Sequence, residues 1–229
     1  MEATLGLRRR FPAKAEGRAA ASGRGRGRFG TRVPFQMSVA ERLLIARLKD
    51  RDESAFNEVV RAHGDKVFSL VYRMIGNRAE AEDLAQEVFV TVFKTVDTFR
   101  SESKFSTWLL RIAANHCKNR IKYLSRRRTD GGGLDAMAEE KMADAGRAPM
   151  QSHIDAPDVL LEAAELENLM QQAIETLDEE HRLLIVLRDV EELSYEEIGE
   201  VSGLPEGTIK SRLHRARMTI KEYLARRTR

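Results

Sequence analysis

The chain has 229 residues, of which 42% are hydrophobic and 33% are charged, a balance typical of one domain or two small ones with modest cores. Its longest apolar runs, such as WLL and LLIVL, are far shorter than the roughly 20 residues that a helix needs to cross a bilayer, so we expect no membrane insertion. A single cysteine, Cys117, excludes an internal disulfide and is typical of a reducing cytoplasm.

The formal net charge of +3 is unevenly distributed along the chain. Residues 1–36 hold nine Lys/Arg and two acidic residues, so the remainder has 30 basic and 34 acidic residues. The basic charge is therefore poor evidence that the folded body binds nucleic acid. This Arg-, Gly- and Ala-rich tail predicts disorder. It lacks the apolar segment that would follow a twin-arginine export signal, while an organelle transit peptide or a nucleic-acid tether stays open.

After residue 36 the sequence predicts helix after helix and an all-α fold, since no run alternates Val, Ile and aromatics as a strand would. Ser38 and Glu41 form a capping-box pattern in MSVAE, which makes Met37 a candidate for the native start. We expect three short helices before residue 77, the second broken near Gly64. Their apolar positions are Leu43, Leu44 and Leu48; Phe56, Val59 and Val60; and Val67, Phe68, Val71, Met74 and Ile75.

The next two helices carry core-facing stripes with polar residues off the stripe. Within residues 81–96, apolar side chains recur at spacings of three and four, which predicts burial of Leu84, Ala85, Val88, Phe89, Val92, Phe93 and Val96. After the polar break DTFRSESK, a second stripe comprises Phe105, Trp108, Leu109, Ile112 and Ala113. Because Trp108 lies on that stripe, we expect it in the core rather than against a ligand.

Residues 129–158, with three consecutive glycines and no helical periodicity, predict a flexible linker between two small helical domains. In the second domain, LSYEEIGEVSGLPEGTIKSRLHRAR has the layout of a helix-turn-helix. Ser194 and Glu197 form a capping box, Gly203 ends the first helix, and Pro205 suits the start of the second. The core stripe of the second helix comprises Ile209, Leu213, Ala216, Ile220 and Leu224. The residues that then point outward are Thr208, Ser211, His214 and Arg215, and those on the flanks are Lys210 and Arg212.

The segments AEDLAQEVFVTVFKTVDTFR and FSTWLLRIAANHCKNRIKYLSRRR, followed by this helix-turn-helix, resemble bacterial sigma-70 family RNA polymerase sigma factors. The resemblance covers roughly residues 38–227 and is closest to the extracytoplasmic-function (ECF), sigma-E-like group. It implies region 2 in residues 37–128 and region 4 in residues 159–229. It also implies a non-enzymatic factor of the cytoplasm and nucleoid, without cofactor or metal, whose partners are core RNA polymerase, promoter DNA and an anti-sigma factor, and which serves a stress response.

The resemblance also implies the roles of individual residues. Asp83, Gln86 and Glu87 would contact core polymerase. The helix-turn-helix would read the −35 element through Thr208, Lys210, Ser211, Arg212, His214 and Arg215. The −10 element would be captured as melted single strand by Phe99, Arg100, Ser101, Ser103, Lys104, Phe105, Arg111, Asn115, Lys118, Asn119 and Lys122, whose contacts must offset the few kcal/mol that unstacking a base costs.

Two other classes of protein remain as alternatives. A helix-turn-helix regulator that binds duplex DNA without polymerase would explain the last helices and leave residues 81–128 unexplained. An enzyme is disfavoured because the sequence has no phosphate-binding glycine loop with Lys-Ser/Thr, no HExxH and no CxxC pair. Adjacent His116 and Cys117 could suggest metal or thiol chemistry, but neighbouring helical residues point about 100° apart, which favours structural roles.

Overall fold

The structure is a computed structural model that describes residues 37–129 and 157–227. The basic tail and most of the predicted linker lie outside these ranges. All described residues belong to one compact unit, and every regular element among them is helical. The all-α prediction is therefore confirmed.

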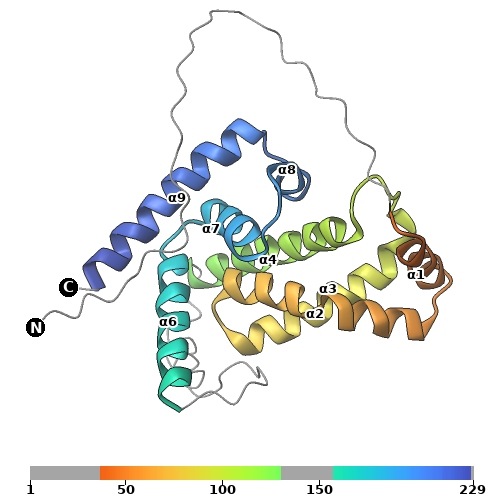
Figure 1. The fold of residues 1–229 in the computed structure, drawn as a ribbon, viewed down its shortest axis with the longest axis horizontal. Helices are drawn as coiled ribbons and strands as arrows, with labels where there is room; N and C mark the ends of the chain where they lie inside the picture. The colour runs from red at the N-terminus through yellow and green to blue at the C-terminus, as the bar shows by residue number, and fades with distance from the viewer. Residues whose placement is uncertain (1–36, 130–156, 228–229) are drawn as a thin grey trace, which may run out of the picture. The chain divides into compact units, whose positions relative to one another are not determined.

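The first group of helices comprises α1 (Val39–Lys49), α2 (Glu53–Ile75), α3 (Arg78–Thr95) and α4 (Phe105–Thr129), with a 3-10 turn η1 (Val96–Thr98) after α3. The second comprises α6 (Pro157–Glu175), α7 (Glu179–Ile185), α8 (Tyr195–Ser202) and α9 (Glu206–Arg227), with a π-helical turn η3 (Val186–Val190) extending α7. Figure 1 shows α2, α3 and α4 packed side by side, and these three helices form the core of the first group.

Short polar side chains start the helices of the first group. Ser38 accepts a hydrogen bond from the Glu41 amide, Asp52 from two amides of the first turn of α2, and Asn77 from the Glu80 amide. Each bond satisfies an amide that has no partner within its helix. Between α2 and α3, Gly76 adopts φ 80°, in the left-handed region. This turn therefore favours glycine for its backbone conformation.

The start of the chain differs from the sequence prediction at two points. The second and third predicted helices are one continuous helix, α2, which runs through Gly64. A mid-helix glycine costs only about 1 kcal/mol relative to alanine, and Val59 and Val67 on either side are both fully buried, so packing outweighs that cost. On α1, Leu43 is 62% exposed instead of lining the core, and Ile45 is buried in its place.

The stripe predicted on α3 is confirmed, since six of its members are buried and Phe93 packs against them.

The two groups of helices also contact each other within the described unit. Arg182 of α7 donates one hydrogen bond to the Met74 carbonyl at the end of α2 (2.7 Å) and others to the Glu175 and Leu177 carbonyls. Arg73 of α2 similarly donates to Gln171 of α6 (3.3 Å). The half-buried guanidinium of Arg182 thus satisfies carbonyl groups at the ends of two helices.

Candidate functional site

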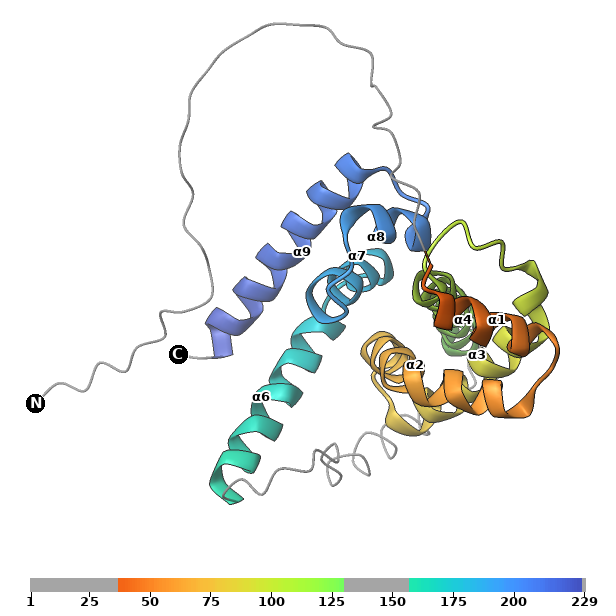
Figure 2. The same ribbon diagram turned by 45° about the vertical axis from the view of Figure 1, so that its right-hand side comes forward.

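The helix-turn-helix formed by α8 and α9 has the local geometry that the sequence predicts (Figure 2). Ser194 accepts from the Glu197 amide and the Glu197 carboxylate accepts from the Ser194 amide, which completes the capping box. Gly203 ends α8 in the left-handed region at φ 75°. Ile198, Val201, Ile209, Leu213 and Ala216 are buried. These contacts fix the angle at which α9 leaves the turn.

The outward face of α9 carries the residues predicted to read duplex DNA. Ser211, His214 and Arg215 are exposed, and Arg215 forms no ion pair with any residue that the structure describes. Arg212, in contrast, is paired with Glu180 of α7, and Lys210 Nζ lies 2.6 Å from Glu206 Oε1. Arg215 is therefore the guanidinium on this face that is most available to a nucleic acid.

Tyr195 at the start of α8 contributes to this surface, a role that the sequence did not indicate. Its ring lies 4.8 Å from the Arg188 guanidinium carbon and 5.1 Å from Lys210 Nζ, both measured to the ring centroid. A cation over an aromatic face is attracted by the electrons of the ring. Tyr195 thus supports Lys210 next to the outward face of α9. The only sign of this role in the sequence is an aromatic residue at the first position of a helix.

The polar segment between α3 and α4 rests on an aromatic cluster. Phe99 and Phe105 are each 2% exposed, and Trp108 is 6% exposed. The Phe99 ring centroid lies 5.4 Å from each of the other two rings. The core position predicted for Trp108 is confirmed. The rings of Phe99 and Phe105 present almost no surface and support the loop between them; their contact with a base stays a prediction.

Between these buried rings, Arg100, Ser101 and Lys104 are exposed, and Ser103 is half-buried. Ser101 has φ 60°, which is uncommon for a residue other than glycine. Such backbone strain is frequent at binding sites. Lys104 Nζ lies 2.8 Å from Glu197 Oε1 of α8, so this carboxylate competes with a DNA phosphate for the ammonium group.

The environment of Glu197 affects its ionisation. Partial burial would raise the pKa of Glu197, but its hydrogen bonds with Lys104 and the Ser194 amide outweigh burial and lower the pKa from the ordinary value of 4.5. The carboxylate that caps α8 is thus ionised at neutral pH.

A polar face of α4 carries the remaining residues predicted to meet the −10 element. Arg111, Asn115, Asn119 and Lys122 are exposed, and Lys118 is half-buried. Positions 111, 115, 118 and 122 follow the three- and four-residue spacing of one helix face. The structure therefore brings these residues together on one side of α4, adjoining the loop.

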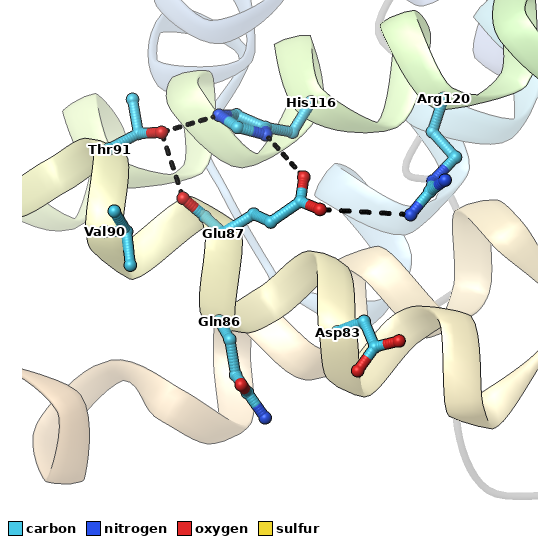
Figure 3. Close-up of a pocket in the computed structure, with 7 residues that line it drawn as sticks. All are labelled: Asp83, Gln86, Glu87, Val90, Thr91, His116 and Arg120. Atoms are coloured by element: carbon cyan, nitrogen blue, oxygen red, sulfur yellow. Dashed lines mark hydrogen bonds and ion pairs between the residues drawn. The ribbon is translucent and has the colours of Figure 1, made fainter.

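The third candidate surface is an open depression of about 540 Å³ between α3 and α4 (Figure 3). Its lining combines the three residues predicted to contact polymerase with four others that the sequence analysis did not assign to it: Asp83, Gln86, Glu87, Val90, Thr91, His116 and Arg120. Val90 is 48% exposed, and its exposure could be inferred from its position off the α3 stripe. His116 and Arg120 lie near Glu87 only because α3 and α4 pack together, so the sequence alone could not place them in this depression.

The position of Cys117 in the core disfavours thiol chemistry at this residue. Cys117 is fully buried, and burial raises the pKa of its thiol to about 12, which disfavours the reactive thiolate. Within residues 37–129 and 157–227, no three His, Cys, Asp or Glu residues are grouped as metal ligands would be. No described helix is long and apolar enough to span a membrane.

Comparison with known proteins matches both groups of helices to one family. The model of Sigma-70 region 2 matches residues 59–127, and that of Sigma-70, region 4 matches residues 167–220. The chain is 40% identical over 194 residues to the "ECF RNA polymerase sigma factor SigW" of Bacillus subtilis (strain 168), a match that covers 83% of this chain and 98% of that protein. It is 36% identical over 182 residues to the "ECF RNA polymerase sigma-E factor" of Escherichia coli (strain K12), covering 80% and 93% of the two chains.

Two solved structures share the fold. CnrH in complex with the cytosolic domain of CnrY matches with a TM-score of 0.54 and 23% identity, covering 81% of this chain and 97% of that one. RpoE from Bartonella quintana, in complex with the anti-sigma factor NepR, matches with a TM-score of 0.57 and 22% identity, covering 74% and 96%.

Proposed function

We propose a division of roles among three surfaces of this chain, which belongs to the ECF group of sigma-70 family RNA polymerase sigma factors. As a sigma factor, it binds core RNA polymerase and directs transcription initiation at specific promoters. The roles of individual residues are proposals that rest on where the structure places them.

The outward face of α9 reads the −35 element as duplex DNA. A recognition helix enters the major groove through its N-terminal turns, where Arg pairs with guanine while Lys and Ser hold phosphates. Arg215 is the strongest candidate for a base contact because its guanidinium is exposed and unpaired with any described residue. Ser211 and His214 lie beside it, while Thr208, Lys210 and Arg212 contribute at the edges of the face.

The loop between α3 and α4, with the polar face of α4, binds the melted −10 element. The loop itself consists largely of polar residues, among them Arg100, Ser101, Ser103 and Lys104. The buried rings of Phe99 and Phe105 hold its two ends. A rigid loop flanked by cations can bind a flipped base because it loses little entropy on binding. Along α4, Arg111, Asn115, Lys118, Asn119 and Lys122 continue the path with groups that bind phosphates or base edges.

The exposed acidic edge of α3 docks on core polymerase. Asp83 and Glu87 are carboxylates on the solvent side of a helix whose other side is core, and Gln86 is exposed as well. Such an edge is complementary to a basic surface on the enzyme. Residues 37–128 would thus bind polymerase and single-stranded DNA, while residues 159–229 bind duplex DNA.

Control by an anti-sigma factor is part of this proposal. It is supported by the family resemblance and by the shared fold with RpoE, which was solved bound to the anti-sigma factor NepR. The chain would act in the cytoplasm at the nucleoid, in a stress response, and without enzymatic activity of its own.

The observation that carries the proposal is that acidic residues on α3 and basic residues on α9 are exposed in separate helix groups of one chain. The experiment measures core binding and promoter binding separately for Asp83→Ala and Arg215→Ala. Asp83→Ala should weaken core binding, while Arg215→Ala should weaken upstream duplex recognition and leave core binding unchanged. Loss of core binding in a folded Arg215→Ala variant would overturn this division.

A further inference from the structure

The carboxylate of Glu87 on α3 faces two basic side chains of α4 (Figure 3). His116 Nδ1 lies 4.0 Å from Glu87 Oε2, and Arg120 Nη2 lies 4.0 Å from Glu87 Oε1. The two oxygens therefore have separate neighbours, one turn of α4 apart. The Glu87 side chain is nevertheless 57% exposed, against 25% for His116 and 27% for Arg120. An incoming partner thus reaches the carboxylate more readily than the two groups behind it.

The hydrogen bonds of Thr91 determine how the His116 ring is oriented. The Thr91 hydroxyl donates its one proton to the Glu87 carbonyl oxygen (2.9 Å). The hydroxyl oxygen also lies 3.0 Å from His116 Nε2. This contact holds the ring with its other nitrogen, Nδ1, toward Glu87.

We propose that His116 and Arg120 are positioning residues that orient the Glu87 carboxylate for core RNA polymerase, so that the docking surface spans α3 and α4. This inference rests on the proposed role of Glu87 in core binding. At 4.0 Å and in partly exposed surroundings, the two groups bias the orientation of Glu87 without forming a tight bidentate pair that would neutralise it. The carboxylate stays available to a cationic side chain of the polymerase, and exposed Val90 on the next turn offers an adjacent apolar contact.

The same helix would then serve two partners from two sides. His116 and Arg120 each follow directly a residue of the proposed −10 face, Asn115 and Asn119. One residue along a helix is a rotation of about 100°, so the polymerase side and the DNA side of α4 are distinct. Substitutions on the polymerase side should therefore change core affinity and leave promoter contacts in place.

The test is a double-mutant cycle on the full chain, labelled at its N-terminus and titrated with core RNA polymerase. The single variants are Arg120→Ala, Arg120→Lys, His116→Gln and Glu87→Ala. Glutamine at position 116 keeps an amide that can hydrogen-bond with Thr91 and removes the nitrogen that faces Glu87. Arg127→Ala, an exposed residue of α4 outside the depression, is the matched control. Thermal unfolding of each variant verifies that the fold is retained.

We expect Arg120→Ala and His116→Gln each to weaken core affinity about two- to five-fold, the range for an exposed charge interaction. Arg120→Lys should restore part of the loss, and Arg127→Ala should change affinity by less than about 1.5-fold. In the Glu87→Ala background, Arg120→Ala and His116→Gln should have no further effect, because the group that they orient is absent.

Additive losses in the Glu87→Ala background would overturn the positioning role, as would an Arg120→Ala variant that behaves like Arg127→Ala. Either result leaves core binding by the unsubstituted chain intact and so leaves the proposed function standing. Failure of the unsubstituted chain to bind core would instead overturn the proposed function and this inference together.

Discussion

Replacing Arg215 by alanine tests the recognition role of α9 most selectively, because a second arginine on the same helix is a built-in control. Arg215 is exposed with no described ion-pair partner, whereas Arg217 is held by Asp189 through two contacts, Nε to Oδ2 at 3.0 Å and Nη2 to Oδ1 at 2.5 Å. The two residues point about 200° apart around the helix. Arg215→Ala should therefore affect DNA, and Arg217→Ala should affect only the attachment of α9 to η3.

The magnitude follows from the contact that Arg215 can make. A bidentate arginine–guanine contact contributes about 1–3 kcal/mol, which corresponds to roughly a 5- to 150-fold loss of affinity for the upstream element. A phosphate contact alone would lower affinity for all sequences similarly and reduce the slope of log K against log salt by about 1. Arg217→Ala should leave DNA affinity unchanged and cost about 0.2–1 kcal/mol of folding stability, as for other exposed pairs.

The assay is binding of holoenzyme, reconstituted with each variant, to a promoter mapped from transcript 5′ ends and to the same fragment with its −35 element scrambled. Titrations over a range of salt concentrations separate base contacts from phosphate contacts. Equal losses for Arg215→Ala and Arg217→Ala would refute the reasoning, since it assigns the two residues to opposite sides of α9.

Three further predictions concern stability and reactivity. Ser194→Ala should lower the free energy of unfolding by about 1 kcal/mol in urea titrations because it removes the cap of α8; an unchanged midpoint would contradict the capping role. Glu197→Gln should flatten the acid side of the stability profile, because a lowered carboxylate pKa stabilises the fold above pH 4.5 and this stabilisation is lost as pH falls through the folded value; parallel profiles would count against it. Cys117, with its thiol pKa raised to about 12, should resist alkylation at pH 8 until the protein unfolds, and rapid labelling of the native protein would show that the site opens.

Helix periodicity predicted the core of α3 and α9 because amphipathic stripes depend on local spacing alone. The helix break predicted at Gly64 is wrong because it depends on contacts between helices and not on local spacing. Helix propensity is a weak local term, and the burial of Val59 and Val67 against other helices outweighs it. Tertiary packing of this kind has no signature in a short stretch of sequence.

In the candidate sites, too, contacts between helices could not be predicted from the sequence. The exposure of Asp83, Gln86 and Glu87 could be predicted because they lie off the α3 stripe. The approach of Arg120 to Glu87 could not, because the two residues are on different helices and meet only through their packing. Phe99 and Phe105 belong to a segment with the family pattern, and only the structure shows that their rings are buried beneath it.

The central claim is that this chain confers promoter-specific initiation on core RNA polymerase through separate polymerase and DNA surfaces. The most direct test is transcription in vitro with purified core, the full chain and a template carrying a promoter mapped after the chain is overproduced in cells. We predict transcripts from the mapped start only when the chain is present, reduced by Glu87→Ala through core affinity and by Arg215→Ala through upstream recognition. Failure of the chain to associate with core, or a start site unaffected by its presence, would contradict the claim.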